Sequence, residues 1–214
     1  MKICIVFYSR HGGSIQRIAE AVAEGAQSVV DSSVTIFRAA DRLPPPLLYS
    51  PVQAESKAYF ELPIVEVSAL AAADAVIFGT STTRGEIDEP MRDLLEQAGP
   101  LWIDRDRIGK VGSVFVPSTP KSDEHKTTLN RFHEMLLGFG MILVGIPYSE
   151  KQILSEEYVD GRRSYGESAA VGVDGFRQPG NSEIGIARFQ GQYVAEITSF
   201  LIRGRAGGKG CGPR

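Results

Sequence analysis

Two hydroxyl side chains and two glycines lie within six residues near the start of the chain, in the segment Ser9-Arg10-His11-Gly12-Gly13-Ser14. A short apolar run at 2–8 precedes this segment, and the residues from 15 onward have the spacing of an amphipathic helix. A loop of this kind directs backbone N–H groups and the positive end of a helix dipole toward one point. The sequence therefore predicts an anion site here, above all for a phosphate group.

The spacing of the glycines separates several kinds of phosphate loop. A dinucleotide fingerprint needs three spaced glycines and an acidic residue closing the second strand, whereas only Gly12 and Gly13 are present and Asp41 falls beyond that strand. The lysine-bearing loop of P-loop NTPases is absent from the sequence. A mononucleotide phosphate fits this loop best, and an ordinary strand–helix turn with a serine cap is the alternative.

Composition restricts the class of protein. With 214 residues, 43% of them hydrophobic, the chain is expected to form one domain with a real core. A formal net charge of −3 gives no general electrostatic reason to bind nucleic acid. The sequence has no apolar run long enough for a membrane span and no signal-peptide pattern, so we expect a cytoplasmic protein. Two cysteines do not make a disulfide framework, and His125 and His133 lack the further ligands of a metal site.

Apolar strand-like runs alternate with helical patterns along the chain. This alternation predicts an α/β fold with an open, parallel five-stranded sheet and helices on both faces. We expect a single domain over 1–202, with an irregular excursion at 43–63, an insertion at 147–181 and a disordered tail at 203–214. Strands are expected at 2–8, 34–38, 74–80, 111–116 and 141–146, and helices from 15 and at 67–73, 89–97, 127–137 and 183–202.

Ligands of such sheets bind beyond the carboxyl ends of the strands. Three segments follow the first, third and fourth expected strands, at 9–14, 80–87 and 117–126. These segments are therefore the expected binding loops.

Four stretches of the chain resemble one protein family. They are YSRHGGS at 8–14, GTSTTRGEIDEPMRDLLEQAGPLW at 79–102, GFGMILVGIPYSE at 138–150 and SYGESAAVGVDGFRQPGNSEIGIARFQGQYVAEI at 164–197. They are similar to WrbA, a flavodoxin-like family of FMN-dependent NAD(P)H:quinone oxidoreductases, and the resemblance extends from residue 3 to about residue 202. The insertion at 147–181 also matches, which distinguishes WrbA from simple electron-carrier flavodoxins.

This resemblance implies a strand order of 2-1-3-4-5 and a two-electron, ping-pong hydride transfer through FMN. NADH or NADPH would be the electron donor and a quinone the substrate, in a homotetramer whose flavin sites are walled by neighbouring subunits. The flavin carries the chemistry, so no catalytic side chain is expected. The FMN phosphate loop of the family falls on Ser9, Arg10, His11, Gly12, Gly13, Ser14 and Ile15, with His11 and Trp102 near the nicotinamide or substrate and Phe139 at a flavin-site histidine position.

The two remaining flavin loops depart from the family pattern. In the first of them the family's proline is lost, its arginine appears one position late in place of the aromatic residue, and its asparagine has become Glu86. This loop is Ser81, Thr82, Thr83, Arg84, Gly85 and Glu86. A glycine-rich family stretch corresponds to Pro117, Ser118, Thr119, Pro120 and Lys121, which contain no glycine. Glu86 would oppose the negative charge of reduced flavin and lower its reduction potential, while Arg84 and Lys121 would supply positive charge. The alternative is a relative with weak or no FMN binding that binds a ligand or partner without turnover.

Overall fold

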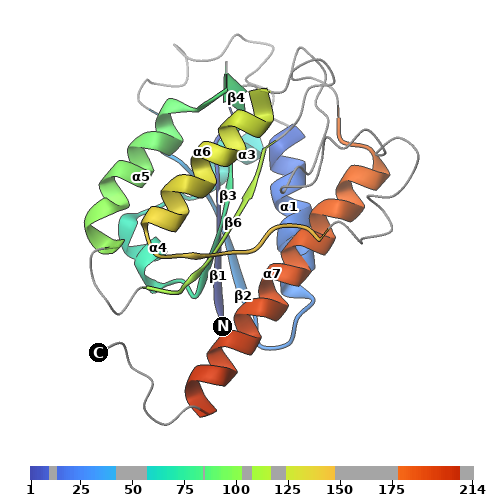
Figure 1. Ribbon diagram of the computed structural model, residues 1–214. Coiled ribbons are helices and arrows are strands. Elements are labelled where there is room, and N and C mark those ends of the chain that lie inside the picture. The colour runs from blue at the N-terminus through green and yellow to red at the C-terminus, as the bar shows by residue number, and fades with distance from the viewer. Residues whose placement is uncertain are drawn as a thin grey trace.

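The protein is built around a parallel sheet of five strands (Figure 1). The computed structural model describes residues 1–9, 14–41, 57–83, 85–102, 108–116, 124–147 and 178–207. The strand order is β2-β1-β3-β6-β7, and every neighbouring pair is parallel. Counted within this sheet alone, the order is the predicted 2-1-3-4-5. The strands are β1 (Lys2–Phe7), β2 (Ser33–Arg38), β3 (Ala75–Gly79), β6 (Val111–Phe115) and β7 (Ile142–Leu143).

The three central strands are buried on both faces. All five residues of β3 and of β6 are buried, as are the last five of β1. Continuous apolar runs of this kind are typical of parallel strands covered by helices on both sides. The edge strand β7 is shorter than the predicted 141–146, because Pro147 has no N–H to extend a ladder and Gly145 weakens a strand.

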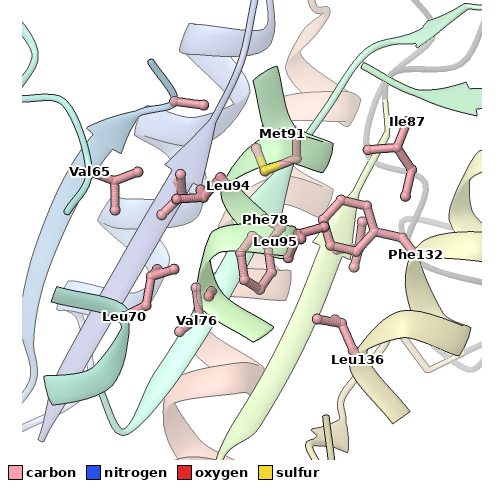
Figure 2. Close-up of a cluster of buried hydrophobic side chains, with 14 of the residues drawn as sticks. Val65, Leu70, Val76, Phe78, Ile87, Met91, Leu94, Leu95, Phe132 and Leu136 are labelled. Atoms are coloured by element: carbon pink, nitrogen blue, oxygen red, sulfur yellow. The ribbon is translucent and has the colours of Figure 1, made fainter. Parts of the chain in front are cut away.

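Two layers of helices cover the sheet (Figure 1). Helices α1 (Ser14–Gln27) and α7 (Asn181–Gly207) bury one face against the apolar cluster that contains Ile5, Ile77 and Phe115. Helices α4 (Val67–Ala72), α5 (Glu89–Trp102) and α6 (Glu124–Gly138) bury the other face. Figure 2 shows this second cluster, in which the rings of Phe78 and Phe132 lie 5.2 Å apart at their centroids.

Helices α1 and α7 cross at very short range. A Cβ added at Gly25 would overlap the main-chain carbonyl of Arg188, and a Cβ added at Gly191 would overlap that of Val22. At the rim of the crossing, Arg188 Nε lies 2.6 Å from a carboxylate oxygen of Glu24. The two glycines therefore permit a backbone-to-backbone approach that sets the position of α1 over the sheet.

Several helices differ from the prediction. Helix α5 continues through Gly99 and Pro100 to Trp102, because a proline in the last turn removes only one helical hydrogen bond. Helix α7 reaches Gly207, five residues beyond the predicted end, and Arg205 donates a 2.8 Å hydrogen bond to the carbonyl of Gly109. A short helix, α3 (Lys57–Glu61), lies within the predicted irregular excursion. None of the helices in the described ranges combines the length and hydropathy needed to cross a bilayer.

Candidate cofactor site

The carboxyl ends of β1, β3 and β6 lie side by side at one edge of the sheet. Parallel pairing continues past the strand ends, because Tyr8 donates to the carbonyl of Gly79 at 3.0 Å and Thr80 donates to that of Phe115 at 3.2 Å. Ser9 and Thr80, which follow β1 and β3, are both buried. The predicted binding loops therefore leave a common, hydrogen-bonded edge, as the fold requires.

Both ends of the predicted phosphate loop lie where an anion site needs them. Ser9 and Ser14 are buried, and Ser14 is the first residue of α1, whose first turn carries no acidic side chain. The N–H groups of that turn have no partners within the helix. Ile15 is buried beneath them in the core, whereas Arg10, His11, Gly12 and Gly13 lie outside the described residues. Hydroxyls at a helix N-terminus suit a phosphate monoester.

A small hairpin follows β3 at the same edge, in the segment expected to contact the flavin ring. Strands β4 (Thr82–Thr83) and β5 (Glu86–Ile87) pair antiparallel, and Gly85 in the turn has a φ of 77°. The base of the hairpin is closed by a hydrogen bond from the Ser81 hydroxyl to the buried carboxylate of Asp88. The carbonyl of Asp88 also accepts hydrogen bonds from Met91 and Arg92 of α5, both at 3.0 Å. Asp88 therefore joins the hairpin to a helix of the core.

Helix α6 holds the other side of the hairpin. The hydroxyls of Thr82 and the buried Thr128 lie 2.5 Å apart, and Thr128 also donates to the carbonyl of Glu86 at 3.3 Å. The Arg131 guanidinium pairs with the Glu86 carboxylate and donates to the carbonyl of Gly85 at 3.3 Å. The Glu86 carboxylate is thus bound to a cation on α6, a partner that the sequence did not indicate.

Two predicted site residues, Trp102 and Phe139, lie at the edge where the strands begin, opposite the edge that carries the phosphate loop. Trp102 ends α5, and only its backbone is described. Phe139 follows α6, is half-buried against the core and precedes the start of β7. The structure therefore does not bring Phe139 or Trp102 to the phosphate loop of their own chain. Arg84, the side chain of Thr83, and the segment Pro117, Ser118, Thr119, Pro120 and Lys121 lie outside the described residues.

Sequence reasoning missed the side chains that support the hairpin. Asp88 precedes a helix whose second residue is Pro90, and an acidic residue before such a helix is a recognisable N-cap signal. Thr128 and Arg131 carry no such signal, because their contacts with the hairpin cross more than forty residues of chain. Their roles arise only when α6 is packed beside β5.

Burial shifts the pKa values of Cys4 and His133 in the direction that favours their neutral forms. Burial raises the pKa of the Cys4 thiol to about 12, so the thiol stays protonated and unreactive. Burial lowers the pKa of His133, which favours its neutral form. Within the described ranges, no group of three or more histidine, cysteine or acidic side chains is placed to hold a metal ion.

The sheet order, the two helical layers and the hydroxyl-flanked loop before α1 define a flavodoxin-like protein. A WrbA-like flavodoxin from Agrobacterium tumefaciens has the same fold, with a TM-score of 0.61 at 22% identity over 93% of this chain and 98% of its own. A flavodoxin from the domain Archaea matches with a TM-score of 0.59 at 16% identity, over 93% of this chain and 99% of its own.

Sequence relatives identify the family within that class. An NAD(P)H dehydrogenase (quinone) of Aromatoleum aromaticum is 42% identical over 207 residues, covering 96% of this chain and 100% of its own. A protein of the same name from Trichlorobacter lovleyi is 41% identical over 94% of this chain and 98% of its own. No family model matches the chain. The chain belongs to the family of NAD(P)H dehydrogenases (quinone).

Proposed function

We propose that this chain binds FMN and catalyses the two-electron reduction of quinones by NADH or NADPH, in a ping-pong sequence. The observation that carries the proposal is the pair of buried hydroxyls at the two ends of the predicted phosphate loop, Ser9 after β1 and Ser14 as the first residue of α1. The sequence is 41–42% identical to NAD(P)H dehydrogenases (quinone) over 94–96% of this chain, which supports the activity.

The residues of this chain would bind and orient the cofactor rather than react. Ser9, Ser14 and the first N–H groups of α1 would hold the phosphate, and each hydrogen bond to its charge contributes about 1.5–3 kcal/mol. The hairpin from Ser81 to Asp88 would hold one side of the ring, because both of its strands are anchored to core helices. The bound flavin would supply the hydride chemistry.

We also propose a homotetramer in the cytoplasm. Three exposed apolar side chains, Ile108, Leu137 and Ile142, lie at the edge where β6 and β7 begin. Trp102 and Phe139 lie at this same edge, so subunit contacts there would let them reach the flavin site of a neighbouring subunit. Light scattering of the purified protein tests the assembly, and a monomer at working concentration would contradict it.

The proposed cytoplasmic location fits the buried, reduced Cys4.

The direct test of the function is an FMN titration followed by turnover. We expect FMN fluorescence to be quenched with a saturable curve, and the loaded protein to oxidise NADH or NADPH when benzoquinone is present. Free FMN without protein is the control for non-enzymatic oxidation. Absence of saturable quenching would contradict FMN binding and favour the ligand-binding relative without turnover.

The Glu86–Arg131 pair makes a prediction about the reduction potential of the bound flavin. Both side chains are about half exposed, at 56% and 46%, so their fields are strongly screened. Glu86→Asn should raise the midpoint potential and Arg131→Gln should lower it, each by on the order of 10 mV. Potentiometric titration measures both shifts. A shift of the same sign in the two variants, or none in either, would contradict an electrostatic role for the pair.

A further inference from the structure

Tyr59 is a buried tyrosine next to the start of the phosphate loop. It belongs to the short helix α3 and is only 1% exposed. Its ring lies edge-on to Phe7, the last residue of β1, with the ring centroids 5.6 Å apart. The guanidinium of Arg38 lies over the same ring, 5.7 Å from its centroid. The ring is thus held between β1 and the end of β2.

The cation over the ring is itself fixed. Arg38 Nη1 lies 3.4 Å from a carboxylate oxygen of Asp41, and Arg38 Nε donates to the carbonyl of Leu62 at 3.3 Å. These contacts leave the Tyr59 ring little freedom to turn its hydroxyl elsewhere. The hydroxyl therefore has a defined direction even though α3 is short.

The Tyr59 ring packs against Phe7, two residues before Ser9, and the backbone N–H of Ser9 is one of the groups that act on the pKa of Tyr59. The Tyr59 hydroxyl is buried and makes no hydrogen bond of ordinary geometry among the described residues. Buried hydroxyls are rarely left in this state, because the unmade bond costs stability. Burial, and next the charge of Asp41, raise the pKa of Tyr59, so the hydroxyl keeps its proton. The Tyr59 hydroxyl can therefore donate a hydrogen bond to an acceptor at the edge where the phosphate loop begins.

We propose that the Tyr59 hydroxyl is a further binding group of the phosphate site, donating its proton to an oxygen of the phosphate held between Ser9 and Ser14. The inference rests on the proposed function, since the phosphate is that of FMN. A phosphate monoester has three terminal oxygens, so it can accept hydrogen bonds from all three hydroxyls at once.

The test is Tyr59→Phe, which keeps the ring and its contacts with Phe7 and Arg38. Affinity for FMN should fall on the order of ten- to a hundred-fold, because one hydrogen bond to a charged group is lost. Affinity for riboflavin, which has no phosphate, should stay unchanged. Without ligand, the variant should melt at the same temperature as the wild type or a few degrees higher, because the unpaired buried hydroxyl is gone.

Tyr193→Phe is the matched control. Tyr193 is a half-buried residue of α7 whose ring stacks on Phe189, 5.8 Å away, and it is no part of the proposed site. Its loss of a hydroxyl should leave the ratio of FMN to riboflavin affinity at the wild-type value.

Three outcomes would overturn the inference. If Tyr59→Phe weakens FMN and riboflavin equally, the tyrosine supports the fold or the ring end of the site and does not bind phosphate. If FMN affinity is unchanged, the hydroxyl has no part in binding. If the wild type binds neither FMN nor inorganic phosphate, the proposed function fails as well. If the wild type binds FMN but Tyr59→Phe does not lower FMN affinity relative to riboflavin affinity, only the inference about Tyr59 fails.

Discussion

Replacing Gly25 or Gly191 by alanine is expected to destabilise the protein. The loss should be larger than for a glycine-to-alanine substitution at any other described helical glycine. The added Cβ would overlap a main-chain carbonyl of the facing helix, that of Arg188 or that of Val22. A carbonyl cannot rotate aside as a side chain can, so α1 and α7 must separate. Overpacking of this kind costs about 1–3 kcal/mol, and more where the backbone must move.

Gly204→Ala provides the matched control for this prediction. Gly204 lies in the same helix as Gly191, is exposed, and has no atom within 4 Å of the position that its Cβ would take. Alanine there should be neutral or stabilise the helix by up to about 1 kcal/mol. Urea denaturation of the three variants measures the free energies of unfolding. Equal values for all three would contradict a tight crossing.

The double variant Gly25→Ala/Gly191→Ala adds a second test. Once one methyl group has separated the helices, the other has more room, so the combined loss should be smaller than the sum of the single losses. Strict additivity would indicate that the two glycines act at independent places.

Asp88→Ala is expected to lower both stability and flavin affinity. The buried carboxylate accepts the hydrogen bond from Ser81 that closes the hairpin, and its removal leaves that hydroxyl without this partner. Losing a hydrogen bond to a charged group costs about 1.5–3 kcal/mol of folding free energy. Because the hairpin faces the ring end of the proposed site, FMN and riboflavin should be weakened by the same factor.

This equal loss distinguishes Asp88 from Tyr59, whose replacement should affect FMN alone. Glu96→Ala is the control, because Glu96 is an exposed acidic residue of the same helix α5. It should change neither the unfolding midpoint in urea nor the affinity for either flavin appreciably. If Asp88→Ala behaved like Glu96→Ala, the Ser81–Asp88 bond would not support the site.

The central sheet could be predicted because its signals are local. The strands β1, β3 and β6 are uninterrupted apolar runs, and each is buried along its length in the folded protein. The helical spacing after Ser14 likewise marks α1, whose buried face follows that spacing. These patterns act within a few residues, so tertiary packing does not alter them.

The ends of the elements and the smallest elements could not be predicted. The strands β4 and β5 have two residues each, too few for an alternating pattern to be recognised. Helix α7 continues into a glycine-rich segment, where Arg205 contacts Gly109 ninety-six residues away. Such contacts add stability that local propensity does not contain.

The sequence by itself establishes a hydroxyl- and glycine-containing loop between a buried strand and a helix, because each residue needed for that inference lies within the same short segment. The tertiary structure alone decides which side chains support this loop and the hairpin beside it. Tyr59 packs on Phe7 across fifty-two residues, and Arg131 reaches Glu86 across forty-five. Contacts between such distant residues depend on how helices pack on the sheet, so no local pattern in the chain records them.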